Sequence, residues 1–490
     1  MTNKFVTNQQ ISTRGIRLLH AKLPFTRSCT DTYARYFGRP GDKIGHELDI
    51  RLPNQVLVRE GPVHQPQPLL ERVTTIPIQT QMGIDLYLTM EELALSADGF
   101  TRRFLQPAMN KLAAAIEFIV MERLSRGVAL KHVLSPGRVL EFEDLLMAKR
   151  HLDFHLAPKS NRRGVFSIHH QRELGNMLQR LYNPRKDLSD DYRNRQLHRV
   201  SGFEFVPSTV VPPFESGLID EAMQLAEAPA YDETDHLANV RQLKLKVASR
   251  NHGLKRPALA RGDFITIDGV MNVHPEVKQV MHEEKPLVVT DSRYDSEGHQ
   301  ALTETMTVTI DPPLVFNGPY QNASGELKAE TLVKKTLRKA AHETSLLYHP
   351  DAFVATFVPL PVPKGVAHAS RTTKDGISMR MVRDYIPKSD LIACRFDVLF
   401  GCKVLRPELA VRLLSPHAKD SQATVWRAQI EEEAAGALEQ GGGAKSKSKK
   451  KRSPNRGAQR KPSQTGEQGQ LNGLEPKDDL VTGTPTESKA

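Results

Sequence analysis

The sequence of 490 residues has few cysteines and no long apolar run. Its three cysteines, Cys29, Cys394 and Cys402, are too few and too widely spaced for a disulfide framework or a four-ligand zinc site. No window reaches the length of a membrane span, and the first residues lack the apolar core of a secretory signal. We therefore expect reduced thiols, no membrane partner and no signal peptide.

Motifs that carry catalysis are also missing. The sequence has no GxxxxGK[ST] phosphate loop, no GxGxxG after a strand and no GxSxG nucleophile turn. The spacing of His151, Asp153 and His155 could suit a metal, as could the adjacent His169 and His170, but no HExxH motif or third fixed ligand accompanies them. We expect a protein that is not an enzyme and that holds no cofactor and no metal.

What the sequence does contain is a hydrophobic content of 39%, enough for several cores, and a net charge of +11 that is unevenly distributed. Residues 416–439 read as an acidic helix, and residues 440–490 are predicted to be a disordered basic tail because almost no apolar residue interrupts them. The tail suits DNA or an acidic scaffold segment, although a merely solvated tail would have the same composition. Its candidate contacts are Lys445, Lys447, Lys449, Lys450, Lys451, Arg452, Arg456, Arg460 and Lys461.

The first half of the chain changes character three times. Residues 1–45 are polar and predict an arm with one short helix near Gln9 to His20. Residues 46–90 alternate apolar and polar side chains around a proline-rich centre, which predicts a long two-stranded loop. The charged residues at its bases could form ion pairs with a neighbouring subunit: Arg59, Glu60, Glu71 and Arg72. Apolar residues at spacings of three and four then predict a long helix over 98–127, kinked or beginning at Pro107.

The second half mixes both kinds of element. Short strands between turns predict a small antiparallel barrel or sandwich over residues 215–325, followed by a helix from about Glu330 to Leu347. In the run LIACRFDVLFGCKVL, strand geometry places Cys394 and Cys402 in one apolar row, roughly 26 Å apart, too far for a disulfide or a shared metal. The opposite face would offer Arg395, Asp397 and Lys403 to solvent or to a neighbour.

Several ordered motifs together resemble P22-like coat proteins of tailed double-stranded-DNA phages. They are FLQPAMNKLA opening the long helix, YHPDAF before LPVPKG, and FDVLFG before RPELAVR. The resemblance covers about residues 35–205 and 330–414, with the insert similar only in position and strand content. It implies an α+β capsid fold of the HK97 type, made of an N-terminal arm (1–45), extended β loop (46–90), spine helix and peripheral domain (91–138), axial domain (139–215), inserted domain (215–325), axial return (326–356) and peripheral strands (357–415).

The same resemblance implies a function. The chain would be a major capsid protein whose copies close into an icosahedral shell around the genome, first as a precursor built on a scaffolding protein. Its partners would be many copies of itself, a scaffolding protein, a portal protein and packaged double-stranded DNA, and it would end in the virion after assembly in the host cytoplasm. The alternatives are the shell of a protein-cargo nanocompartment, or a nucleic-acid-binding protein that acts through its basic tail.

Overall fold

The computed structural model describes most of the first 416 residues, and these form part of one contact unit, residues 1–421. The described ranges are 8–30, 47–64, 66–67, 71–89, 97–181, 199–219, 222–229, 240–248, 259–294, 303–337, 340–387 and 391–416. The predicted acidic helix and the predicted basic tail lie outside them, apart from Pro416. No helix within the described ranges is long and apolar enough to cross a membrane.

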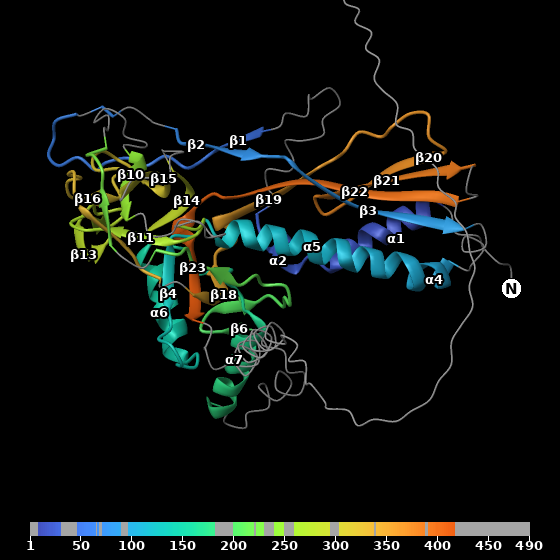
Figure 1. Ribbon diagram of the computed structural model, residues 1–490, viewed down its shortest axis with the longest axis horizontal. Helices are drawn as coiled ribbons and strands as arrows, with labels where there is room; N and C mark the ends of the chain where they lie inside the picture. Colours follow the sequence, from blue (N-terminus) through green and yellow to red (C-terminus); the bar gives the residue numbers. More distant parts are fainter. Residues whose placement is uncertain are drawn as a thin grey trace, which may run out of the picture. The chain divides into compact units, whose positions relative to one another are not determined.

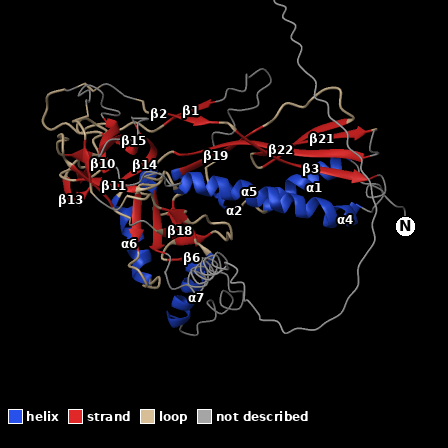
Figure 2. Cartoon of the chain, viewed as in Figure 1, coloured by secondary structure: helices blue, strands red, loops and turns tan. Residues whose placement is uncertain are grey.

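A five-stranded antiparallel sheet is organised around its longest strand, β22 (Leu391–Val404). Strand β3 runs along one edge of β22, and β21 followed by β19 runs along the other. Helices α1 and α5 pack against this sheet, as Figure 2 shows in blue beside red strands. The elements are β3 (Thr80–Thr89), β19 (Phe353–Val358), β20 (His368–Lys374), β21 (Ile377–Ile386), α1 (Asn8–Ala21), α2 (Pro24–Ser28), α4 (Ala97–Phe100) and α5 (Gln106–Ser125).

Two sequence predictions for this layer are confirmed. A short helix occupies the arm, and a long one follows the extended region, where a π-helical turn over Thr101–Leu105 joins α4 to α5 directly before Pro107. The missing amide hydrogen of proline explains why the regular α-helical ladder restarts there.

Strand β22 also has the predicted apolar row, with Cys394 and Cys402 buried beside Phe396 and Phe400. The prediction for the opposite face is wrong at Asp397, which is fully buried rather than open to solvent. Its carboxylate accepts hydrogen bonds from Arg380 Nη2 at 2.7 Å and from Arg395 Nε at 2.8 Å. A buried carboxylate needs such donors, so the two arginines cover it.

A second sheet of seven strands carries α6 (Phe142–Phe154) and α7 (Ile168–Leu181). Its central strand is β18 (Ala341–Tyr348), paired with β23 on one side and with β5 and β8 on the other. The remaining strands are β4 (Leu130–Val133), β5 (Arg163–Val165), β6 (Arg199–Val200), β7 (Phe203–Phe205), β8 (Phe214–Glu215) and β23 (Ala410–Pro416). Short 3-10 turns at Pro350–Ala352 and Pro407–Leu409 precede β19 and β23.

This sheet corrects two predictions. The helix expected from Glu330 to Leu347 is wrong, because that segment forms two strands, β18 of this sheet and β17 (Leu332–Lys335) of the barrel described below. Residues Ser345 to Tyr348 are all buried, and burial between paired strands outweighs a helical sequence pattern. The final strand of the expected peripheral set, β23, pairs with β18 and β4 of this sheet and not with β22.

The insert forms a closed six-stranded barrel, as the strand spacing predicted. It has an apolar core of its own, separate from the core shared by the helices and sheets. The barrel closes only through β17, so it continues past residue 325, where the sequence placed its end. Its strands are β9 (Met223–Leu225), β10 (Val240–Ala248), β11 (Phe264–Ile267), β14 (Leu287–Tyr294), β15 (Thr303–Leu314) and β17 (Leu332–Lys335), with a side sheet of β12 (Met271–Val273), β13 (Val280–Glu284) and β16 (Ala323–Ser324).

Strands β1 (Glu47–Arg51) and β2 (Val73–Pro77) form an antiparallel hairpin. We call residues 52–72, which join them, the extended loop. Figure 1 shows this loop, in blue, running from the hairpin past the barrel strands. The region predicted to be one long loop therefore divides into this hairpin and β3, which belongs to the five-stranded sheet.

Candidate functional site

The tip of the extended loop exposes apolar side chains. Val56, Val58 and Val63 lie largely in solvent, and Val58 is 97% exposed. The tip is held by bonds within the loop: Arg59 donates to the carbonyl groups of Gly61 and of Val63, the latter at 2.9 Å. Exposed apolar groups on a projecting loop mark a surface for a partner.

Two further hydrogen bonds within the loop join its two halves. The Leu57 amide donates to Gln67 Oε1 at 2.8 Å, and Gln67 Nε2 donates to the Leu57 carbonyl at 2.7 Å. This reciprocal pair replaces the strand ladder, which ends further back. The tip is thus a small folded unit at the end of a hairpin.

The four charges predicted to make contacts do not form one cluster. Arg59 and the exposed Glu60 lie at the tip, whereas Glu71 and Arg72 lie where the loop returns to β2. Glu71 pairs with Arg51 of the same chain at 2.9 Å, an exposed ion pair that contributes on the order of 0 to 1 kcal/mol. Arg72 stacks on the ring of Tyr320, with 5.4 Å between the guanidinium carbon and the ring centre.

The base of the loop rests on the barrel and on β22. The Gln55 amide donates to the Tyr320 hydroxyl at 3.2 Å, and the Leu52 amide donates to the Arg72 carbonyl at 2.9 Å. Below them, Lys403 Nζ donates to the Thr75 carbonyl at 2.9 Å. Tyr320 carried no signal in the sequence, since a single aromatic residue in a turn matches no motif.

A buried carboxylate joins the arm to the long helix. Glu117 of α5 accepts hydrogen bonds from the Phe25 amide (2.6 Å), the Thr26 amide (3.2 Å) and the Thr26 hydroxyl (2.6 Å) at the start of α2. Burial raises the pKa of Glu117, and these hydrogen bonds oppose the rise. The contact satisfies amide groups at the beginning of a helix, which otherwise lack partners.

Two cations lie between the seven-stranded sheet and the barrel. Arg412, paired in register with Lys131, is fully buried and donates to the carbonyl groups of Val128 at 3.2 Å and Gly262 at 2.6 Å. Both cations stack on Phe264 of the barrel, at 3.8 Å for Arg412 and 4.7 Å for Lys131. Burial, and next the charge of Arg412, lowers the pKa of Lys131 to about 7.

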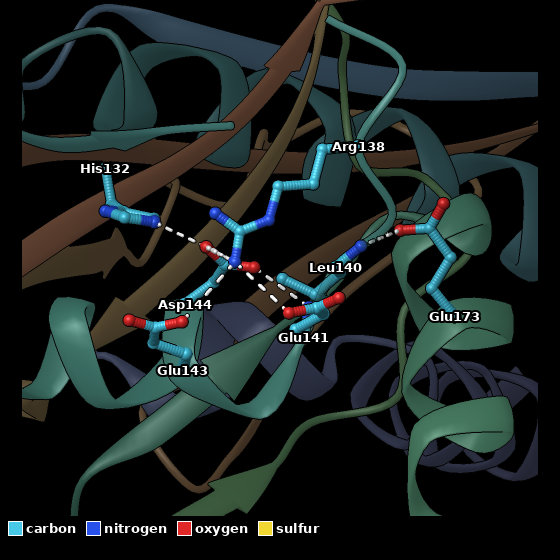
Figure 3. Close-up of polar contacts among 7 residues, drawn as sticks. All are labelled: His132, Arg138, Leu140, Glu141, Glu143, Asp144 and Glu173. Carbon is cyan, nitrogen blue, oxygen red and sulfur yellow. Dashed lines mark hydrogen bonds and ion pairs between the residues drawn. The ribbon is translucent and has the colours of Figure 1, made fainter. Parts of the chain in front are cut away.

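The polar residues near α6 serve the helix itself. Glu141 and Asp144 form a capping box at its start, and Asp144 also contacts His132 at 2.9 Å (Figure 3). Arg138 pairs with Glu141 at 3.2 Å. These contacts account for the carboxylates without requiring a ligand.

The histidines with metal-like spacing have partners of other kinds. His155 contacts the His151 carbonyl at 2.9 Å, and Asp153 pairs with Arg162 at 2.7 Å. His170 lies between the hydroxyl groups of Ser345 (2.6 Å) and Ser415 (2.8 Å). Among the described residues, no group of histidines, cysteines and carboxylates has an arrangement that could hold a metal ion.

A comparison with known families gives a match over part of the chain. Residues 219–414 match the model of a family described as P22 coat protein, gene protein 5. The matched region contains the barrel, which the resemblance drawn from the sequence covered only by position and strand content, and continues through β23. A comparison with curated proteins gave no match.

Several solved structures with some similarity come from phages. Mycobacterium phage Che8 matches at 10% identity and a TM-score of 0.38, over 79% of this chain and 89% of that chain. The capsid of Cyanophage P-SCSP1u matches at 10% identity and a TM-score of 0.36, over 76% of this chain and 84% of that chain. The capsid of Helicobacter pylori bacteriophage KHP30 matches at 8% identity and a TM-score of 0.32, over 76% of this chain and 84% of that chain. With scores of this size, the assignment depends on the family match and the sequence motifs.

The barrel, the projecting loop and the family match define the class: this is a structural protein of a virus shell and not an enzyme. More particularly, residues 219–414 match the P22 coat protein family, and the chain is a major capsid protein, a coat protein whose copies form the icosahedral shell of a bacteriophage. Its place is the virion.

Proposed function

We propose that copies of this coat protein close into the shell through the extended loop, which reaches from one subunit across the next. The observation that carries the proposal is the row of exposed valines at the tip, led by Val58. Burying these side chains against a second copy removes apolar surface from water, and each contact remains weak enough to be reversed. Reversible contacts let a growing shell correct misplaced subunits.

The proposal includes a division of the chain in the HK97 manner. Helix α5 is the spine, the five-stranded sheet is the peripheral domain, and the seven-stranded sheet with α6 and α7 is the axial domain. The inserted barrel extends to Lys335, and β23 belongs with the axial domain. Residues 1–45 form the arm that precedes them.

We also propose the partners of the shell. Assembly in the host cytoplasm begins on a scaffolding protein and a portal protein, and double-stranded DNA then fills the shell. The basic residues between Lys445 and Lys461 bind the DNA or an acidic scaffold segment. Nuclease-resistant DNA inside purified particles separates this function from that of a protein-cargo compartment, and closed particles separate it from that of a nucleic-acid-binding protein without a shell.

The substitution Val58→Asp tests the role of the loop. A carboxylate at the tip cannot be buried against a second subunit without losing its hydration, so we expect unassembled subunits in place of shells by electron microscopy and sedimentation. Val277→Asp is the matched control, since Val277, in the turn between β12 and β13, is 71% exposed. Shells formed by Val58→Asp in normal yield would show that the tip does not join subunits.

A further inference from the structure

The two ends of the extended loop meet at one side chain of the barrel. Gln55, on the outgoing segment, donates its amide hydrogen to the hydroxyl group of Tyr320, and Arg72, on the returning segment, stacks on the ring. Tyr320 lies between β15 and β16 and is 5% exposed. One buried residue of the insert therefore contacts both segments of the loop.

The contact with Tyr320 lies just beyond the point where the hydrogen-bond ladder between β1 and β2 ends. The ladder of β1 and β2 ends at the pair Arg51 and Val73, and one further bond joins Leu52 to Arg72. A two-stranded ribbon is only marginally stable by itself. Beyond the ladder, the contacts with Tyr320 hold both segments against the barrel, so they decide in which direction the tip points.

The contact also combines two different interactions. The hydroxyl group satisfies an amide that has left the ladder, and the ring face attracts the guanidinium group from the other segment. Removing the hydroxyl group alone would release Gln55 and leave Arg72 in place. The two interactions can therefore be separated by substitution.

We propose that the inserted barrel directs the extended loop toward the neighbouring subunit, with Tyr320 as the positioning residue. This inference rests on the proposed function of the loop. It gives the insert a role in assembly: the insert fixes the direction of a contact that another part of the chain makes. A loop held in one direction meets its partner without first losing conformational freedom, so it binds faster and more tightly than a free loop.

The first test uses unassembled subunits and trypsin, which cuts after Arg59. Tyr320→Ala should raise the rate of this cut about tenfold, because a stack and a hydrogen bond are lost together. Tyr320→Phe should give a smaller increase, since it keeps the stack. Tyr294→Ala, on β14 of the same barrel, is the control, and trypsin should cleave it after Arg59 at the same rate as the unsubstituted protein.

The second test follows assembly by light scattering and electron microscopy. Tyr320→Ala should assemble more slowly and give fewer closed shells, with Tyr320→Phe between it and the unsubstituted protein. Unchanged melting of the subunits shows that the barrel itself is intact. If Tyr320→Ala does not fold, Tyr320→Phe, which removes one oxygen atom, decides the matter.

The outcomes separate the two proposals. If Val58→Asp blocks assembly while the folded Tyr320 variants keep normal cutting rates and normal shells, the loop joins subunits but Tyr320 does not position it. If Val58→Asp assembles normally, the function of the loop is wrong. Faster cutting in Tyr320→Ala without slower assembly would overturn the positioning role as well.

Discussion

Single buried charges connect neighbouring elements of this chain. Glu117 of α5 binds the start of α2, and Asp397 of β22 binds Arg380 of β21 and its own neighbour Arg395. Burial acts to raise the pKa of Asp397, but hydrogen bonds from the two arginines hold it below its usual value. A buried ionised group is tolerated because each of its oxygen atoms has a donor.

Replacing Glu117 should weaken the contact between the arm and α5, which also pack through apolar side chains. Glu117→Ala leaves two amides and a hydroxyl group without an acceptor, so we expect a loss of about 2 to 4 kcal/mol in the free energy of unfolding. Glu117→Gln keeps one acceptor oxygen and should lose less. Urea unfolding of unassembled subunits measures both.

The control for this prediction is Glu122→Ala on the same helix. Glu122 pairs with Arg126 at a half-exposed site, and such a pair contributes on the order of 0 to 1 kcal/mol. Equal losses for Glu117→Ala and Glu122→Ala would contradict the role given to Glu117.

Sequence patterns could predict the buried cysteines but not these buried charges. Alternation along β22 correctly placed Cys394 and Cys402 in the apolar row, where burial raises the pKa of each thiol to about 11. The same rule placed Asp397 on the polar face, and this is also where it lies. The burial of Asp397 depends on Arg380, which reaches it from a neighbouring strand, and no pattern within one strand can contain that information.

Among the elements, the junction between sheet and barrel is the most unusual. Strands β4 and β23 bring Lys131 and Arg412 side by side, and both stack on Phe264 of β11. The other charges near them are Glu284 on β13, Asp263 before β11 and Arg126 after α5. Asp263 already accepts hydrogen bonds from Ser216, Gly217 and Ala260.

This junction should make stability depend on pH above neutrality. The pKa of Lys131 is about 7 in the folded chain, against 10.5 for an ordinary lysine. Between these values the unfolded chain binds more protons, so the free energy of unfolding should rise with pH. Lys131→Met removes the charge, so the variant should be more stable than the unsubstituted protein at pH 7, by roughly 1 to 4 kcal/mol.

Urea unfolding at about pH 7 to 9, within the window that linkage defines, measures this difference. Lys111→Met, at an exposed position of α5, is the control and should leave the slope with pH unchanged. If Lys131→Met were less stable at neutral pH and kept the slope, the lysine would be a charged anchor and the prediction would be wrong.

A helix or strand could be predicted when the residues that determine it lie within the segment itself, and not when a distant strand determines it. The alternation of β22 and the helical spacing of α5 are written within each segment, and both predictions hold. Strand β17 is different, because it closes the barrel by pairing with β9 more than a hundred residues earlier. Its sequence resembles a helix, and only the distant partner makes it a strand.

At the scale of the whole molecule, the described residues form two large apolar cores, one shared by the helices and the two sheets and one inside the barrel. The barrel has its own apolar core, and a small cluster of Phe214, Phe264, Leu337 and Leu414 lies at its junction with the seven-stranded sheet. The extended loop depends on a few polar contacts, whereas the arm also places Ile11, Ile16 and Phe25 in the main apolar core. Such a subunit can keep its cores intact while the linked parts adjust to neighbours, which a closing shell requires.

The proposed role of the basic tail, DNA binding, can be measured only in assembled shells. Deleting residues 440–490 should lower the amount of DNA that shells retain, because nine positive charges that could neutralise phosphates are lost. The attraction depends on charge and not on order, so a tail with the same residues in scrambled order should retain DNA normally. Replacing the nine by glutamine should act like the deletion.

Salt gives the sharper measurement of this prediction. Nine phosphate contacts correspond to a slope of about −8 in the logarithm of the binding constant against the logarithm of salt concentration, and the deletion should lose most of it. Nuclease treatment of shells opened at several salt concentrations gives the retained DNA. Equal retention by full-length and deleted chains at low salt would mean that the tail does not bind the genome, and protease removal of the tail from closed shells would then indicate a role on the outer surface.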